Sequence, residues 1–121
     1  MAGTVVTTEK KIGTVAKITF AWTTDGGTAA ADATTTGTYD GEILGLATIP
    51  SAVTAPADNY DVTIKDSDGF DVLLGTGANR DEANTEYVDR ASLAAVSTSK
   101  LTLGITNAGN AKLGTTVIWV R

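Results

Sequence analysis

The stretch Val15-Ala16-Lys17-Ile18-Thr19-Phe20-Ala21-Trp22 alternates between large apolar side chains and small or polar ones. Successive side chains of a β-strand point to opposite faces of the sheet, so a period of two is the mark of a strand with one buried face. Here Ile18, Phe20 and Trp22 share one face and the smaller residues between them share the other. The stretch therefore predicts a half-buried strand, with Trp22 in the core.

The same alternation recurs along the chain, and no helical periodicity competes with it. Further strands are expected over Glu42–Ile49, Asn59–Lys65, Glu86–Asp89, Lys100–Thr106 and Thr115–Arg121. Two hairpins are expected. One turns at Asp66-Ser67-Asp68-Gly69 and continues through Phe70, Val72 and Leu74. The other joins Lys100–Thr106 to Thr115–Arg121.

The stretch from Thr23 to Thr38 is rich in Thr, Asp, Gly and Ala and carries no large apolar residue until Tyr39. It is expected to be a long exposed loop, with a short helix over Ala29–Ala33 as the alternative.

With roughly six to eight short strands, the chain is expected to be all-β. The predicted fold is an antiparallel β-sandwich, Ig-like or jelly-roll-like, with a small β-barrel as the alternative. The predicted organisation is an N-terminal arm or edge strand over residues 1–11 and one sandwich domain over residues 12–121.

The composition points away from catalysis. The chain has no His and no Cys, so the commonest general base and the commonest thiol nucleophile are both missing. No nucleophile-elbow or phosphate-loop motif is present, so no catalytic or cofactor-binding residue is assigned and no cofactor is expected. A carboxylate pair that meets only in the fold is the one remaining route to an enzyme.

The Asp66-Ser67-Asp68-Gly69 stretch is similar to the start of a calcium loop, but position twelve of such a loop, which needs a bidentate Glu, is Gly77. The stretch is therefore interpreted as a turn in which the Asp side chains bind nearby backbone amides. No metal site is assigned, although weak metal binding at Asp66 and Asp68 stays open.

The formal charge of −5 argues against binding to nucleic acid or to an anionic membrane surface, because both need clustered Lys and Arg. The nine basic residues are scattered along the sequence, and Lys10-Lys11 is the only adjacent pair. No apolar run approaches the ~18 residues that span a bilayer.

Several residues are candidates for contact with a partner. An edge strand or arm over Thr4–Lys11 can add to another sheet or reach an acidic surface. Arg80 lies in a charged loop, where it is either an interface residue, a solvated turn residue or the partner of Asp81 or Glu82. Trp119 either fills the core or forms a contact surface. The candidate interface residues are Val5, Val6, Lys10, Lys11, Arg80 and Trp119.

Several short runs from Tyr39 onward carry a resemblance to a known group of proteins. They are Tyr39-Asp40-Gly41-Glu42, Ala55-Pro56-Ala57-Asp58-Asn59-Tyr60-Asp61-Val62, Asp66-Ser67-Asp68-Gly69, Gly75-Thr76-Gly77-Ala78-Asn79-Arg80-Asp81 and Leu101-Thr102-Leu103-Gly104-Ile105-Thr106-Asn107-Ala108-Gly109-Asn110-Ala111-Lys112. In these runs the chain resembles small structural proteins of tailed bacteriophages. The stretch from Asp25 to Thr38 has no counterpart in the resemblance.

The resemblance implies a non-enzymatic head decoration (cement) or minor capsid protein, and it brings no set of binding residues with it. The implied partners are the major capsid protein and further copies of the chain in a trimer or dimer. The implied location is the capsid surface of the virion, after folding in the host cytoplasm, where a chain without Cys is at no disadvantage. A tail or head–tail joining component is the alternative within the virion. A carbohydrate-binding or adhesion module is the alternative from another class, and it predicts an exposed aromatic pair with Asp and Asn nearby.

Overall fold

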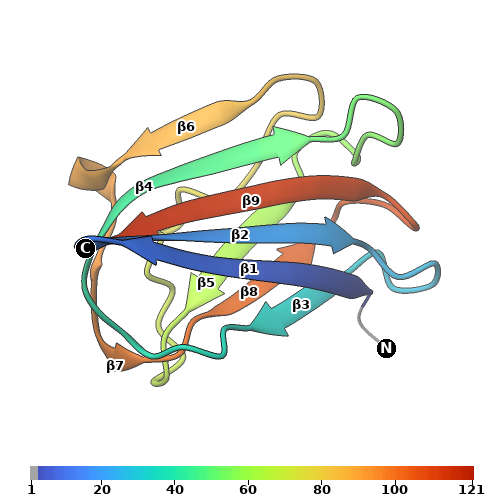
Figure 1. Cartoon of the computed structure of the whole chain (residues 1–121). Coiled ribbons are helices and arrows are strands. Elements are labelled where there is room, and N and C mark those ends of the chain that lie inside the picture. The colour runs from blue at the N-terminus through green and yellow to red at the C-terminus, as the bar shows by residue number, and fades with distance from the viewer. Residues whose placement is uncertain (1–2) are drawn as a thin grey trace.

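Two antiparallel sheets lie face to face in the computed structural model, which describes residues 3–121 apart from the side chain of Ile12 (Figure 1). Met1 and Ala2, which belong to the predicted arm, lie outside the described residues. The elements are β1 (Thr4–Ile12), β2 (Val15–Thr23), β3 (Ala31–Thr34), β4 (Tyr39–Pro50), β5 (Asp61–Lys65), β6 (Glu86–Asp89), the 3-10 helix η1 (Arg90–Ser92), β7 (Ala95–Ser99), β8 (Thr102–Thr106) and β9 (Leu113–Val120).

The larger sheet has the order β1-β2-β9-β4-β6, and β7 pairs with one end of β4. The smaller sheet has the order β3-β8-β5. All of these pairings are antiparallel. Figure 1 shows the larger sheet as the front layer and the smaller sheet behind it. The predicted all-β sandwich is confirmed.

The core lies between the two sheets and contains the inward faces of both. Trp22 is 1% exposed, and its ring centroid lies 5.6 Å from that of Tyr60 on the opposite side of the core. Its indole nitrogen donates a hydrogen bond to Thr116 Oγ1 at 3.3 Å. The ring fits because β9 has Gly114 there, where a Cβ atom would lie 2.2 Å from the Trp22 ring. The prediction that Trp22 is a core residue is confirmed.

The expected hairpin between Lys100–Thr106 and Thr115–Arg121 is wrong. β8 lies in the smaller sheet between β3 and β5, whereas β9 lies in the larger sheet between β2 and β4. The connection after Thr106 therefore crosses from one layer to the other. Alternation along a strand shows which face is buried, but it does not identify the neighbouring strand.

The stretch Thr23–Thr38 is not one long loop, because it contains the strand β3. The alternative helix over Ala29–Ala33 is wrong because β3 begins at Ala31. β3 pairs with β8 over four residues, and Ala31 is fully buried. Thr35, just after the strand, is also buried, and its hydroxyl accepts a hydrogen bond from the Leu101 amide at 3.0 Å. A strand that buries Ala and Thr has no large apolar side chains to reveal it. β7 was also missed, so the described residues form nine strands.

The expected strand through Phe70, Val72 and Leu74 is wrong as well. Gly69 has the positive φ expected of the turn, at 82°, but beyond it only an isolated bridge joins Lys65 to Asp71. The Asp71 carboxylate accepts hydrogen bonds from the amides of Ile64, Leu73 and Gly75. These bonds curl the chain into successive turns, which leave Phe70 and Leu74 half exposed while Val72 is buried.

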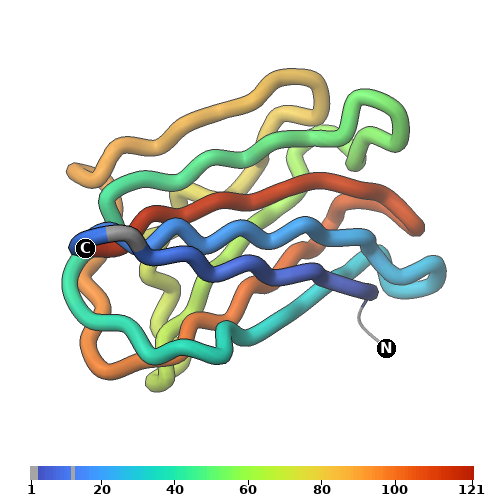
Figure 2. The backbone as a smooth tube through the Cα atoms, viewed as in Figure 1, coloured from blue at the N-terminus to red at the C-terminus, as the bar shows by residue number. Residues whose placement is uncertain are grey.

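β1 is an edge strand of the larger sheet. It pairs with β2 from Thr4↔Thr23 to Ile12↔Val15, and Val5 packs against the core. Figure 2 shows the backbone of β1 running alongside that of β2.

The Glu9 carboxylate fastens β1 to the connection between β3 and β4. It accepts hydrogen bonds from the Tyr39 hydroxyl at 2.5 Å, the Thr36 amide and hydroxyl at 2.9 Å, and the Gly37 amide at 3.0 Å. Burial by itself raises the pKa of Glu9, but these hydrogen bonds together hold that pKa below its ordinary value. Glu9 therefore ties the edge of the larger sheet to the segment that leads out of the smaller one.

We expect Glu9→Gln to lower the free energy of unfolding by about 1 kcal/mol near neutral pH. The side-chain NH2 group of Gln is a donor, and it would replace an oxygen that now accepts hydrogen bonds. A carboxyl group whose pKa is lowered by folding stabilises the protein above its unfolded-state pKa. That stabilisation is lost as the pH falls through the folded-state pKa. Urea unfolding of both proteins should therefore show a gap in the free energy of unfolding near neutral pH that closes at acidic pH, below the lowered pKa of Glu9. Glu82→Gln, in an exposed loop, is the control, and an equal gap at both pH values would contradict the role of Glu9.

Candidate functional site

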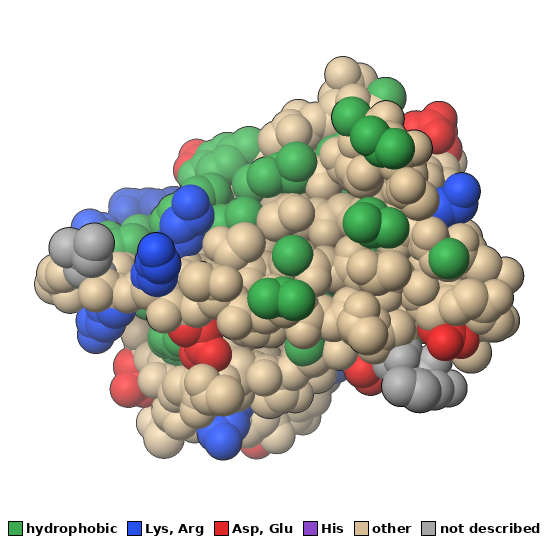
Figure 3. All heavy atoms as spheres, turned by 45° about the vertical axis from the view of Figure 1, so that its right-hand side comes forward, with side chains coloured by type: hydrophobic (Ala, Val, Ile, Leu, Met, Phe, Trp, Pro, Cys, Tyr) green, Lys and Arg blue, Asp and Glu red, His purple; other side chains and the backbone are tan. Residues whose placement is uncertain are grey.

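The outward face of the larger sheet carries the largest collection of exposed apolar side chains on neighbouring strands of the described chain. Directly opposed residues in neighbouring strands point to the same side of a sheet, so the register determines which outward side chains are neighbours. We call this surface the aromatic face. Its apolar part consists of Val6, Ala21, Ile49, Tyr87, Leu113 and Trp119, with the buried Ala47 and Val117 and the hydroxyl of Thr115 among them. In Figure 3, hydrophobic side chains are spread over this side of the molecule.

Tyr87 and Trp119 meet near one end of the aromatic face, above Gly45. Trp119 lies directly opposite Gly45 across the β4–β9 ladder, and Tyr87 is opposite Ala47 across the β4–β6 ladder. A Cβ atom at Gly45 would lie 2.2 Å from the Tyr87 hydroxyl, so the ring covers the space that the glycine leaves. The two ring centroids are 6.2 Å apart and the rings are inclined by 53°. Tyr87 is 62% exposed and Trp119 is half-buried.

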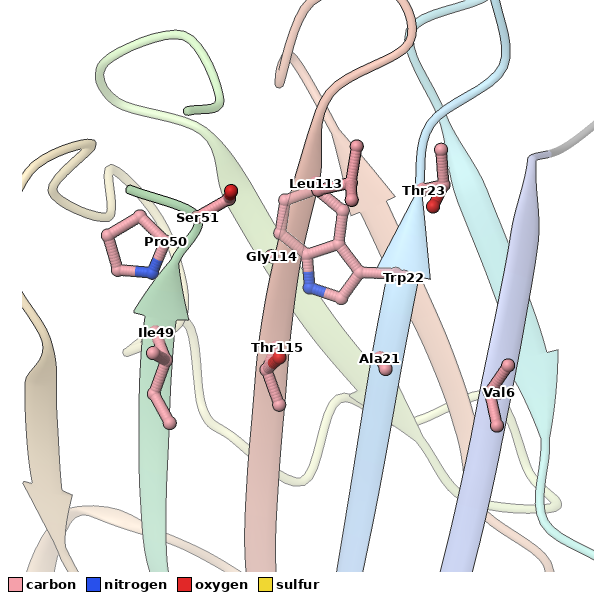
Figure 4. A pocket seen from close by; sticks show the side chains of 10 residues that line it. All are labelled: Val6, Ala21, Trp22, Thr23, Ile49, Pro50, Ser51, Leu113, Gly114 and Thr115. Atoms are coloured by element: carbon pink, nitrogen blue, oxygen red, sulfur yellow. The ribbon is translucent and has the colours of Figure 1, made fainter. Parts of the chain in front are cut away.

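A shallow hollow of about 430 Å³ extends the aromatic face toward the ends of β2 and β4 (Figure 4). Val6, Ile49 and Leu113 border it, and Val6 is 69% exposed. Trp22 also lines the hollow, but it is only 1% exposed and offers little surface there. The polar groups that line the hollow are few, so it offers apolar contact and little hydrogen bonding.

The apolar part of the aromatic face offers aliphatic and aromatic contact, to which Tyr87 and Thr115 add hydroxyl groups. Aromatic side chains at the centre with polar groups around them are typical of protein interfaces. Within residues 3–121, no group of three potential metal ligands comes together. None of the helices described is both long and apolar enough to cross a membrane.

The structure places only some of the predicted interface residues on this face. Val6, Lys10 and Trp119 lie on it, so the contact-surface alternative for Trp119 describes its position better than the core alternative. Val5 is turned the other way and packs against the core. Lys11 is exposed beside Tyr39 and Arg121, around a separate hollow of about 470 Å³.

Arg80 belongs to an internal pair. Its Nε lies 3.4 Å from Glu86 Oε1, and its side chain is only 12% exposed. The alternative that Arg80 forms an internal ion pair is therefore correct, but its partner is Glu86 and not Asp81 or Glu82. An interface role for Arg80 has no support from this position.

The Asp66–Gly69 stretch is a turn. Asp66 Oδ1 accepts hydrogen bonds from the Asp68 amide at 2.9 Å and the Phe70 amide at 3.0 Å. The interpretation that Asp side chains bind local backbone amides is confirmed for Asp66.

Sequence reasoning missed Tyr87, Ile49 and Leu113. The Glu86–Asp89 alternation placed Tyr87 on one face of a short strand, but nothing in the sequence showed that this strand neighbours β4. The position of Gly45 in a strand was a usable signal, because a glycine inside a strand often marks a close approach of another group.

Comparison with known proteins adds little beyond the fold. No family model matches the chain, and no curated protein matches it. Among solved structures, it is similar to the low-affinity xylan-binding module CBM86 from the gut symbiont Roseburia intestinalis, with 6% sequence identity and a TM-score of 0.45. The similarity covers 99% of this chain and 89% of that one. At this identity and TM-score the likeness carries no argument about function.

Proposed function

We propose that this chain is a non-enzymatic binding module that docks on another protein through the aromatic face, and that the partner is the major capsid protein of a tailed bacteriophage. The observation that carries the proposal is the meeting of Tyr87 and Trp119 above Gly45, within a wider apolar surface. Interfaces are enriched in Tyr and Trp at their centres, and such residues contribute most of the binding free energy.

The shape of the surface supports a protein partner. Val6, Ile49 and Leu113 extend the apolar area from the ring pair to the far end of the sheet, across four strands. Exposed apolar side chains that gather on one face of a domain support an interaction site there. The backbone beneath the face is paired in one sheet from β1 to β6, so docking needs little ordering of the backbone.

The choice of a capsid partner rests on the resemblance of the runs from Tyr39 onward to small structural proteins of tailed bacteriophages. Burial of an apolar face against the shell would stabilise the shell by binding alone, without any chemistry. Many copies of the module on one particle would then act as a cement. Association into a homo-oligomer is part of the same proposal.

The test is mass spectrometry of purified particles of the phage that encodes this chain, with the copy number measured against the major capsid protein. We expect a high copy number in a fixed ratio to the shell protein. A low copy number matching one or a few rings would place the chain in the tail or at the head–tail joint. Absence from the particle would refute the virion proposal.

Carbohydrate binding is the second candidate function. One observation favours it: Tyr87 is exposed beside Trp119, with Asp89 two residues further along β6, and aromatic rings near polar groups are suited to sugar stacking. The inclination of 53° and the aliphatic surroundings favour a protein partner instead, because the pair forms one patch and not two parallel platforms. Glycan-array binding that is lost in Trp119→Ala, together with absence from particles, would establish this second candidate.

A further inference from the structure

Two basic residues that are separated in the sequence, Lys10 and Lys17, come together at one end of the aromatic face. Lys10 on β1 lies directly opposite Lys17 on β2, and Lys17 lies directly opposite Trp119 on β9. Both lysines are exposed. Figure 3 shows Lys and Arg side chains gathered at this end of the molecule. The scatter along the sequence therefore hides one pair of lysines that the strand register brings together.

The structure leaves this lysine pair without an internal counter-charge. The ion pairs of the described chain are Arg80–Glu86 and Arg90–Glu42, and neither includes Lys10 or Lys17. Like charges directly opposite each other in a sheet destabilise it. The chain has a net charge of −5, yet neither of these ion pairs brings an acidic residue to Lys10 or Lys17.

The two lysines also form the walls of a shallow site. Together with Thr8 and Thr19 they line a hollow of about 220 Å³. The site thus presents two ammonium groups and two hydroxyl groups, all of which can donate hydrogen bonds to an anion. It adjoins the ring pair, since Lys17 and Trp119 are cross-strand neighbours.

We propose that Lys10 and Lys17 receive an Asp or Glu carboxylate of the protein that docks on the aromatic face; this rests on the proposed function and specifies the chemistry of the partner surface. An acidic group there would neutralise the lysine pair while apolar groups of the same partner cover Tyr87 and Trp119. The lysine pair thereby fixes the orientation of docking, because only one end of the face is basic. A nucleic acid fits poorly, since two lysines on a chain of net charge −5 are a weak counterpart for a row of phosphates.

The experiment measures binding of the full chain to purified shells that lack it, over a range of salt from about 50 to about 500 mM NaCl. For the wild type we expect affinity to fall as salt rises. The double variant Lys10→Gln/Lys17→Gln should bind at least about 10-fold more weakly at low salt and show a flatter salt dependence. The matched control is Lys65→Gln/Lys100→Gln, which removes the same charge from exposed positions at the end of β5 and in the connection before β8.

The outcomes separate this inference from the proposed function. Wild-type affinity and salt dependence in Lys10→Gln/Lys17→Gln, or an equal loss in the control, would overturn the carboxylate site while leaving docking intact. Failure of the wild type to bind shells would overturn both. Binding of labelled double-stranded DNA that is lost in Lys10→Gln/Lys17→Gln would also overturn the inference, because the lysines would then serve a nucleic acid.

Discussion

Trp22→Ala is expected to lower the free energy of unfolding by about 3–5 kcal/mol, which is a large share of the stability of a domain of this size. Trp22 is fully buried, contacts the Tyr60 ring and bonds to Thr116, so its removal leaves a cavity and an unpaired hydroxyl in the core. Guanidinium unfolding followed by circular dichroism measures the change.

Trp119→Ala is the matched control for that prediction, because it removes the same side chain from the outward face of the sheet. Trp119→Ala should lower the free energy of unfolding by clearly less than Trp22→Ala does, since the Trp119 ring is only half-buried. Equal losses from the two substitutions would show that Trp22 is not the centre of the core.

The second large effect concerns attachment. We expect Tyr87→Ser/Trp119→Ala to weaken binding to shells by roughly 100-fold or more, because central aromatic residues of an interface each contribute about 2 kcal/mol or more. Co-sedimentation with shells that lack the chain measures this, and thermal unfolding checks that the variant is folded. Phe70→Ser/Leu74→Ser is the control, since both residues are half exposed but lie outside the aromatic face.

Gly45→Ala refines the same prediction without removing either ring. The new methyl group would displace the Tyr87 ring from Trp119, and we expect an intermediate loss of binding. Wild-type binding by the double variant, or an equal loss in the Phe70/Leu74 control, would contradict the docking face.

Local patterns in the sequence identified most of the strands, although not β3 and β7, and showed which faces of several of them are buried. The alternation at Ile18, Phe20 and Trp22 predicted β2 correctly, and the same reasoning placed Tyr60, Val62 and Ile64 in the core. These are properties of a single strand, and period-two alternation is sufficient to show them.

Strand partners depend on contacts between distant segments, and the sequence did not reveal them. β9 lies between β2 and β4, so it pairs with segments far away in the chain and not with its predecessor β8. The aromatic face depends on the same pairings, because Tyr87 and Trp119 meet only when β6 and β9 flank β4. Trp119 was found as a candidate from its residue type, whereas Tyr87 needed the register.

The pairing of the two lysines also depends on the strand register. Lys10 and Lys17 are seven residues apart around a tight turn, and antiparallel pairing of β1 with β2 brings them directly opposite each other. Linear spacing made them look scattered, and only the register of this hairpin shows that they form a pair beside Trp119.

The central claim is that the outward face of the larger sheet contacts a shell protein, and a cryo-EM reconstruction of shells with the chain bound tests it most directly. The predicted result is a map in which Tyr87 and Trp119 are buried against the shell and a shell carboxylate lies near Lys10 and Lys17. A map in which the smaller sheet or the loops make the contact, with Tyr87 and Trp119 exposed to solvent, would contradict it.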